Sequence, residues 1–372
     1  MPSRRSFLET GVASLSIAVA GCSSLPRLRR PDGTDWTGSV PTPGLLRPPV
    51  TTEGIVVAGG RRENDGEQGR LVAFDAETGA KQWNQEFGRM TGLTAADGSI
   101  YVGEKRDGDR ARIRSLEAET GTRRWTRTVS NLASAMTVAD DTLYTANGTL
   151  TALATADGSH RWERTRVGET DFTVVGAPDD QLGVDTRSIL FGDHNGVVAL
   201  APSDGSLVWR WNPEQWDGTT VGPLPVDETI YVGGSGSVVA LDRTDGSVRW
   251  RTAFGRDAEV TGLHVTESTV LVAEKTDDAP SDSFGTIYEL SLEDGSERYE
   301  LRFDTPIARA ASTATTFVVG TTDGTVTWTG GASFFDRSET TLPTDDYVLG
   351  AAGTRAFAQT DDGTLWALSP PA

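Results

Sequence analysis

The sequence predicts an all-β fold: an eight-bladed β-propeller of four-stranded antiparallel blades, with the ring closed by an N-terminal strand that completes the last blade. Three observations predict it. A unit recurs eight times at intervals of about 42 residues, which is typical of propeller blades. Each unit holds short β-branched runs separated by glycine-containing turns. The eighth unit stops before its fourth strand, so another part of the chain must supply that strand.

The unit is clearest at Leu71–Trp83, where the small residue Ala73 precedes an aromatic residue by ten positions. The same spacing returns at Ile113–Trp125, Leu150–Trp162, Val197–Trp209, Val238–Trp250 and Ile287–Tyr299, with Glu289 replacing the small residue in the last. The seventh copy, 326–331, is degenerate, and Arg337 stands where its aromatic residue is expected. These copies predict one repeat domain rather than the two or three domains that 372 residues suggest.

Blade five shows the four strands of a unit most plainly. Residues 221–226 are expected to form the inner strand and 230–234 the second, with Asp227-Glu228-Thr229 turning the chain between them. Ser235-Gly236 predicts a tight hairpin into a third strand at 238–242. Asp245-Gly246 then turns the chain into the outer strand at 248–252.

The outer-strand aromatic residues are predicted to have a structural role. A large ring can lie over a glycine turn or a small residue of the neighbouring blade and bury about 150–250 Å² of surface. We therefore expect one docking aromatic per blade rather than a set of ligand platforms. The predicted docking residues are Trp36, Trp83, Trp125, Trp162, Trp209, Trp250 and Tyr299.

The last blade is predicted to be completed from the opposite end of the chain. The eighth copy, 365–369, carries Ala367 at the small-residue position, and its docking position would fall beyond the C-terminus. Trp36, within residues 35–40, has no repeat of its own and fills that position. Closing the ring in this way leaves no free sheet edge and fixes both ends of the chain.

The first residues are typical of an export signal. A charged start containing Arg4 and Arg5, an apolar run from Gly11 to Gly21 and small residues before Cys22 are the parts of such a signal. Ser3-Arg4-Arg5-Ser6-Phe7-Leu8 resembles the twin-arginine export motif, and Val19-Ala20-Gly21-Cys22 resembles a lipobox. We therefore expect a signal peptide at 1–21, a lipid on Cys22, a flexible tether at 22–31 and the propeller at 32–372. The protein is then anchored on the extracytoplasmic face of the cell membrane.

The composition excludes several classes of function. The net charge of −19 argues against nucleic-acid binding, which needs a basic surface. The single cysteine excludes a disulfide framework and multi-cysteine metal sites. Acidic residues with only three lysines (Lys81, Lys105 and Lys275) resemble the proteins of salt-loving archaea, which indicates a halophilic, haloarchaeal protein. A monomer is expected.

The pattern Ala73-x-Asp75-x-x-Thr78-Gly79-x-x-x-Trp83 resembles the tryptophan-docking repeat of the pyrroloquinoline quinone (PQQ) propeller family, over about residues 33–372. Neither the WD-repeat nor the kelch pattern fits. The resemblance extends to BamB-type lipoproteins and implies a non-catalytic scaffold that binds other proteins. Two alternatives stay open: a quinoprotein dehydrogenase-like enzyme or sugar binder that uses the central channel, and a surface lipoprotein with no fixed partner.

The resemblance also implies what an enzyme of this family would need. Quinoprotein dehydrogenases resemble one another in a pair of adjacent cysteines, a calcium site of Glu and Asn, and a catalytic Asp. Because Cys22 is the only cysteine, we expect neither PQQ nor any other cofactor, and no catalytic residue. His160, His194 and His264 fall in three blades without metal-ligand spacing. Asp277, Asp278 and Asp282 share one loop that could bind calcium, although a metal site is not the favoured interpretation.

Departures from the minimal blade indicate where a partner binds. The polar segments 61–68, 105–110 and 276–284 join the second and third strands of their blades, so they should leave the same face of the ring. Residues 179–187 are expected to extend the first hairpin of blade four on the opposite face. Trp211 and Trp216 are extra to the repeat, as either exposed contact residues or local packing.

Overall fold

The computed structural model describes the ranges 30–40, 48–61, 69–106, 110–130, 135–146, 149–167, 170–171, 182–184, 187–193, 196–213, 221–234, 236–255, 258–276, 284–312, 316–330 and 337–370, together with residues 133 and 216. The chain divides into two compact units, Met1–Arg30 and Pro31–Ala372. Arg4, Arg5 and Cys22, with the predicted signal and nearly all of the tether, lie outside the described residues. No helix in the described part of the chain is long and apolar enough to cross a membrane.

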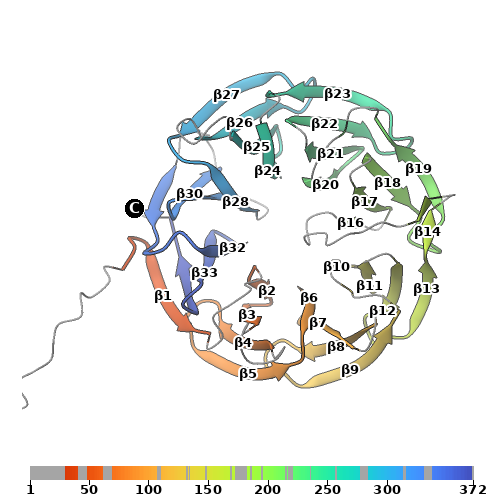
Figure 1. The fold of residues 1–372 in the computed structure, drawn as a ribbon, viewed down its shortest axis with the longest axis vertical. Coiled ribbons are helices and arrows are strands. Elements are labelled where there is room, and N and C mark those ends of the chain that lie inside the picture. The colour runs from red at the N-terminus through yellow and green to blue at the C-terminus, as the bar shows by residue number, and fades with distance from the viewer. Residues whose placement is uncertain are drawn as a thin grey trace, which may run out of the picture. The chain divides into compact units, whose positions relative to one another are not determined.

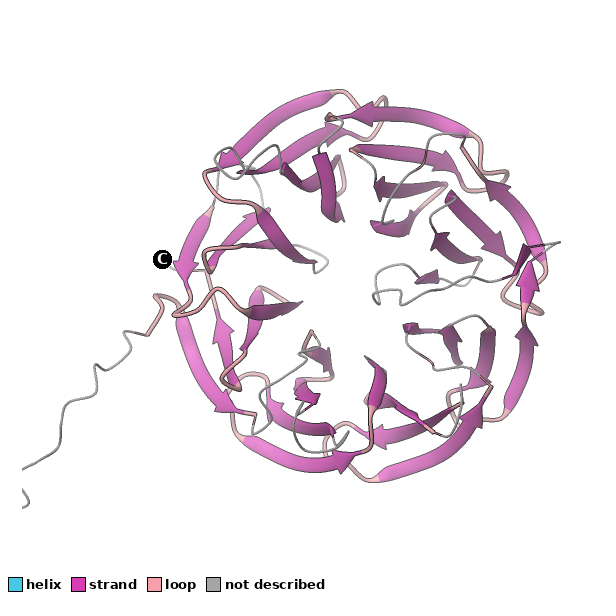
Figure 2. Ribbon diagram, viewed as in Figure 1, coloured by secondary structure: helices cyan, strands magenta, loops and turns pink. Residues whose placement is uncertain are grey.

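The described residues of the second unit form eight four-stranded antiparallel sheets in a ring, which confirms the predicted propeller (Figures 1 and 2). The first four blades comprise β2 (Val50–Thr52), β3 (Ile55–Arg61), β4 (Gly69–Asp75) and β5 (Lys81–Phe87); β6 (Met90–Ala96), β7 (Ser99–Lys105), β8 (Ala111–Glu117) and β9 (Arg123–Val129); β10 (Ala135–Ala139), β11 (Thr142–Ala146), β12 (Leu150–Ala154) and β13 (His160–Arg164); and β16 (Leu182–Val184), β17 (Ile189–Asp193), β18 (Gly196–Leu200) and β19 (Leu207–Trp211).

The remaining blades continue the same order around the ring. They comprise β20 (Val221–Val226), β21 (Thr229–Gly234), β22 (Ser237–Asp242) and β23 (Val248–Ala253); β24 (Ala258–Val265), β25 (Thr269–Thr276), β26 (Phe284–Ser291) and β27 (Glu297–Phe303); β28 (Ile307–Ser312), β29 (Thr316–Thr321), β30 (Thr325–Gly330) and β31 (Ser338–Thr341); and β32 (Tyr347–Ala352), β33 (Arg355–Thr360), β34 (Thr364–Leu368) and β1 (Thr34–Ser39).

The N-terminal strand closes the ring as the sequence predicts. Strand β1 pairs antiparallel with β34, and Trp36 lies opposite Ala367. This is the register that places Trp83 opposite Ala73 and Trp125 opposite Ser115 in blades one and two. The first and last strands of the propeller therefore form one blade, in which β1 covers the edge that β34 would otherwise leave unpaired.

Two connectivity patterns define the faces of the ring. We call the edge that holds the turns between the third and fourth strands, such as 118–122 in blade two, the turn face. The opposite edge is the loop face, which holds the connections between the second and third strands and between successive blades. Because β1 is a fourth strand, the chain enters the ring from Pro31 at the turn face.

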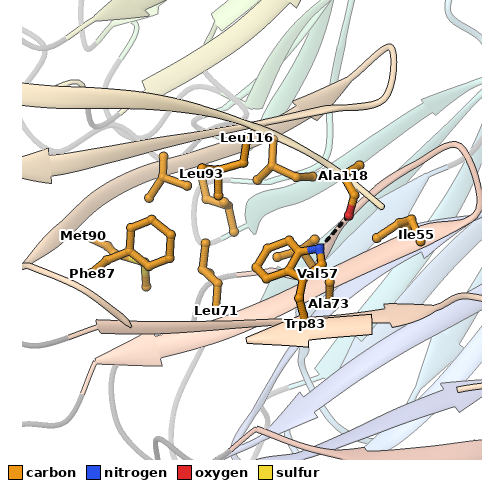
Figure 3. Close-up of a cluster of buried hydrophobic side chains, with 12 residues drawn as sticks. Ile55, Val57, Leu71, Ala73, Trp83, Phe87, Met90, Leu93, Leu116 and Ala118 are labelled. Atoms are coloured by element: carbon orange, nitrogen blue, oxygen red, sulfur yellow. Dashed lines mark hydrogen bonds between the residues drawn. The ribbon is translucent and has the colours of Figure 1, made fainter. Parts of the chain in front are cut away.

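Apolar clusters between adjacent blades form the core. Figure 3 shows the cluster between blades one and two, where Leu71 and Trp83 meet Leu93 and Leu116. In β8 the buried residues Ala111 and Ile113 pack instead toward blade three. Since alternate side chains of a strand point to opposite faces of the sheet, each blade buries both of its faces against its neighbours.

Two local predictions are wrong. Residues 182–184, predicted to belong to an extended hairpin, form β16, the inner strand of blade four; the extra hairpin is β14–β15 (Arg166–Val167 and Thr170–Asp171), which precedes it. In blade seven the residue opposite Thr327 is Glu339 and not Arg337, because the chain between these paired residues is longer than the chain between Ala73 and Trp83 in blade one.

Candidate protein-binding face

Six tryptophans dock successive blades onto one another. Each indole Nε1–H donates a hydrogen bond to a backbone carbonyl of the next blade, for example from Trp83 to Ala118 at 2.7 Å (Figure 3). A Cβ at Gly121 would lie 2.9 Å from the Trp83 ring, and the φ of this glycine is +71°. Equivalent bonds join Trp36 to Ala76, Trp125 to Thr155, Trp162 to Pro202, Trp209 to Arg243 and Trp250 to Leu292. These rings are buried between blades, so no ligand can stack on them.

Tyr299 does not share the environment of the six tryptophans. It occupies the equivalent register position on β27, opposite Glu289, but its side chain is 48% exposed. Partial burial raises the pKa of the Glu289 carboxyl. The turn of blade seven that would meet a docking ring, 331–336, lies outside the described residues.

The two extra tryptophans after blade four pack locally. Trp216 is buried in a cluster with Trp209 and Ile230, and its ring lies 5.0 Å from the ring of Trp211 in an edge-to-face arrangement. Trp211 is partly buried on the same cluster. The sequence left two alternatives open for these residues, exposed contacts or local packing. Trp216 packs locally.

On the turn face, the carboxylates of Asp75 and Asp242 accept hydrogen bonds from neighbouring residues of the same blade. Asp75 accepts hydrogen bonds from the backbone N–H and the hydroxyl of Thr78, which lower its pKa. Bonds from Thr244 and Arg249 lower the pKa of Asp242 to about 2. Such internal bonding explains the Asp-rich turns as structural features and not as a cation or ligand site.

The loop face carries the three polar segments. The strand pairs β3–β4, β7–β8 and β25–β26 bring all three to this face, as their position between second and third strands predicts. Residues 62–68, 107–109 and 277–283 of these segments lie outside the described residues. The structure does describe the ends of the strands that flank these segments, and the charged side chains of the candidate site lie there.

A buried carboxylate lies where the polar segment 105–110 leaves the sheet of blade two. Glu104, at the end of β7, is buried between blades one and two. Its Oε1 accepts the backbone N–H of Gly88 at 2.8 Å, and its Oε2 lies 2.8 Å from the Nε atoms of both Arg112 and Arg114. Two guanidinium groups therefore share one carboxylate, which leaves a net positive charge at this edge of the loop face.

The two arginines are held rigidly but stay accessible. The guanidinium of Arg114 lies over the Phe87 ring, 5.1 Å from its centre, and partial burial lowers the pKa of this arginine. The Arg112 and Arg114 side chains keep 28% and 22% of their surface exposed. Within the described chain no residue accepts a hydrogen bond from the two terminal nitrogens of Arg112. We name Glu104, Arg112, Arg114 and Phe87 the blade-two cluster.

Blade six carries a buried glutamate at the same place with different neighbours. Glu274 occupies the position of Glu104, and Thr286 and Tyr288 replace the two arginines in register. The hydroxyl of Thr276 donates to Glu274, and Tyr288 stacks on Phe254 with ring centres 4.4 Å apart. This end of the loop face holds no arginine pair on its third strand.

The histidines and acidic loops do not form a metal site in the described chain. His264 is buried and stacks on Phe317, and burial lowers its pKa. His160 is exposed, and His194 lies outside the described residues. No three or more His, Cys, Asp or Glu side chains among those described are arranged to hold a metal ion. Asp277, Asp278 and Asp282 fall outside the described part.

Sequence reasoning missed the blade-two cluster. The signal was present in β8, where Arg112 and Arg114 share a strand face with the buried Leu116. Glu104 ends an otherwise apolar strand, which is unusual for a buried position. These positions could be connected only once the pairing of Glu104 with Arg112 was known.

Comparison with known proteins places the fold. The solved structure of BamB from Moraxella catarrhalis is 19% identical over 90% of this chain and 99% of that chain, with a TM-score of 0.61. The computationally designed protein Ika8 is 16% identical over 89% and 98% of the two chains, with a TM-score of 0.66. Quinohemoprotein alcohol dehydrogenase ADHIIG from Pseudomonas putida HK5 is 14% identical over 91% of this chain and 76% of that chain, with a TM-score of 0.63. These likenesses show the fold alone, and no curated protein sequence matches significantly.

A family model supplies the assignment. The model described as outer membrane protein assembly factor BamB matches residues 67–212 and, in a second match, 193–345. Together the matches span most of the blades that carry the tryptophan-docking repeat. The chain therefore belongs to the BamB family of PQQ-like repeat β-propellers.

Proposed function

We propose that this protein is a lipid-anchored, extracytoplasmic scaffold that binds other proteins through the loop face and catalyses no reaction. The observation that carries the proposal is a chemical difference between the two faces of the ring. On the turn face, acidic side chains such as Asp75 and Asp242 are bonded within their own turns. The loop face carries the three polar segments and the blade-two cluster. Variable loops on a rigid scaffold are where recognition resides.

The entry point of the chain supports this orientation. Pro31 leads into β1 at the turn face, so a lipid on Cys22 would tether that face toward the membrane. The loop face would then point away from the membrane, where a protein partner can reach it. A Cys22→Ser variant should move from the membrane fraction to the soluble fraction, whereas continued membrane association would contradict the lipid anchor.

The lengths of the two kinds of relative also favour a scaffold. The match covers 99% of the BamB chain but 76% of the dehydrogenase chain. With Cys22 as its only cysteine, the protein cannot form the pair of adjacent cysteines that the quinoprotein resemblance requires. Protein refolded with PQQ and calcium should therefore show no cofactor absorbance and no dye-linked oxidation of alcohol or glucose. Positive results in both assays would overturn the non-catalytic proposal in favour of the enzyme.

Crosslinking in intact membranes tests the scaffold directly. The wild-type protein should give discrete crosslinked species, and deletion of residues 61–68 from the loop face should remove or weaken at least one of them. An unchanged pattern would exclude a contact through this segment. The absence of any crosslinked protein would favour a surface lipoprotein with no fixed partner.

A further inference from the structure

The two opposite sides of the ring differ sharply in charge. The blade-two region, 88–134, contains nine basic and six acidic residues, in a chain whose net charge is −19. The blade-six region, 254–306, contains four basic and thirteen acidic residues. These blades lie four positions apart in the ring, on opposite sides of it (Figure 1). The positive charge of blade two is thus a local exception to the acidity of the chain.

Much of this positive charge is gathered on the loop face. Arg106 and Arg110 are exposed at the ends of the segment that joins β7 to β8, and the backbone N–H of Arg106 donates to the carbonyl of Arg110 at 2.8 Å. Arg112 and Arg114 continue the row along β8. The only carboxylate in the cluster, Glu104, is buried beneath the arginines, where it orients them. The exposed side chains of this row that the structure describes are basic; Asp107 and Asp109, between Arg106 and Arg110 in the sequence, lie outside the described residues.

Stability alone does not account for the two arginines. A buried ion pair is weak evidence for stability, because desolvation offsets most of the attraction. Blade six shows that a buried glutamate at this position can stand beside Thr286 and Tyr288 instead. Arg112 contacts Glu104 through Nε, so its two terminal nitrogens stay available, and their planar fork matches a second carboxylate. Arg114 instead donates to Glu104 from both Nε and Nη2, the latter at 3.1 Å from Oε1.

We propose that the blade-two cluster, with Arg106 and Arg110, is the docking surface for an acidic segment of a partner protein; this inference rests on the proposed scaffold function and specifies its binding region. Carboxylate side chains of the partner pair with Arg106, Arg110 and the terminal nitrogens of Arg112 on the loop face, and Arg114 holds Glu104 beside them. Anionic lipid is disfavoured as the occupant, because the chain enters the ring at the opposite face.

Binding of poly-L-glutamate to the purified full-length protein tests the surface. The double variant Arg106→Glu/Arg110→Glu should weaken this binding at least tenfold at low salt. The matched control is Arg123→Glu/Arg298→Glu, which changes the net charge by the same amount at exposed positions on the turn-face ends of β9 and β27. The affinity of this control for poly-L-glutamate should stay within about twofold of wild type. Wild-type binding should fall steeply toward 1 M salt, where the Debye length is about 3 Å.

Equal losses in the two double variants would overturn the proposal, because they would reflect net charge and not this surface. Binding to vesicles of equal phosphatidylglycerol and phosphatidylcholine that is lost in Arg106→Glu/Arg110→Glu but kept in the control would also overturn it, in favour of a lipid surface. Self-association of the wild type that is lost in the same variant would assign the acidic partner to blade six of a second copy, and would likewise overturn it.

A photo-crosslinking residue placed at position 110 or at position 259 separates this inference from the scaffold function. Capture of a protein partner at 110 but not at 259 is the expected result. Capture only at 259, on blade six, would refute the docking surface and leave the scaffold function standing. No capture at either position would count against both.

Discussion

Blades two and six occupy opposite sides of one ring, and both carry Glu-Lys near the end of the second strand, yet the groups around that glutamate differ. Glu104 is neutralised by two arginines from the next strand, whereas Glu274 is bonded to Thr276 beside stacked aromatic rings. The same backbone position thus lies opposite an arginine in one blade and opposite a threonine in the other. The residues on the paired strand determine this difference, since they supply the groups that surround the buried carboxylate.

The outer strands of the two blades differ as well. Trp125 of blade two is buried and donates to the carbonyl of Thr155, but Tyr299 of blade six is 48% exposed. The ring at the docking position is therefore buried in blade two and half exposed in blade six. Four experiments test this difference between the two blades.

The largest difference is expected at the docking position. Trp125→Ala should lower the free energy of unfolding by about 4 kcal/mol, because it leaves a cavity between blades and removes a buried hydrogen bond. Tyr299→Ala should cost less than about 1 kcal/mol, because its ring is half exposed. Urea unfolding followed by circular dichroism measures both losses. Equal losses would show that Tyr299 docks as the tryptophans do.

The buried glutamates should respond next most strongly. Glu104→Gln should cost about 3 kcal/mol, because it leaves two partly buried guanidinium groups without their counter-charge. Glu274→Gln should cost about 1 kcal/mol, since a neutral amide can still accept the hydrogen bond from Thr276. The same urea experiment compares the two variants. A larger loss for Glu274→Gln would reverse the assignment of the charged site.

A smaller, pH-dependent effect is expected in blade six. Burial lowers the pKa of His264, so below pH of about 6.5 the unfolded chain binds a proton that the folded protein does not. The stability is therefore complete above that pH and declines as the pH falls. His264→Gln should flatten the dependence of Tm on pH between 7.5 and 5.5, with exposed His160→Gln as the control. An unchanged slope in His264→Gln would exclude this origin.

The smallest effect is expected at the turns. Ser296 lowers the pKa of Asp294 through its backbone and hydroxyl hydrogen bonds. This contribution is present above pH of about 4 and is lost as the pH falls toward the lowered pKa. Asp294→Asn should therefore reduce the acid sensitivity of unfolding slightly, whereas the neighbouring exposed Glu293→Gln should not. Identical acid profiles for wild type and Asp294→Asn would contradict this role of the turn.

The fold was predictable because its signals are local and repeated. A small residue, a Thr-Gly or Asp-Gly turn and an aromatic residue recur within thirteen positions of one another, as in Leu71–Trp83. Even the closing strand was predictable, because Trp36 was a docking residue without a repeat and the repeat of Ala367 had its docking position beyond the last residue. Blade four was harder: β16 has only three residues, too few for a period-two pattern to stand out.

The sequence by itself determined the number of blades, the way the ring closes and the face from which the polar segments leave, because each follows from periodicity along the chain. Only the tertiary structure decided that Glu104 lies under Arg112 and Arg114, that Phe87 of the preceding blade supports one of them, and that Tyr299 stays half exposed. Those contacts depend on which strands pair in which register and on which blade packs against which. The physical reason is that a carboxylate, a guanidinium and a ring interact through space, where the spacing of residues along the chain gives no direct measure of distance.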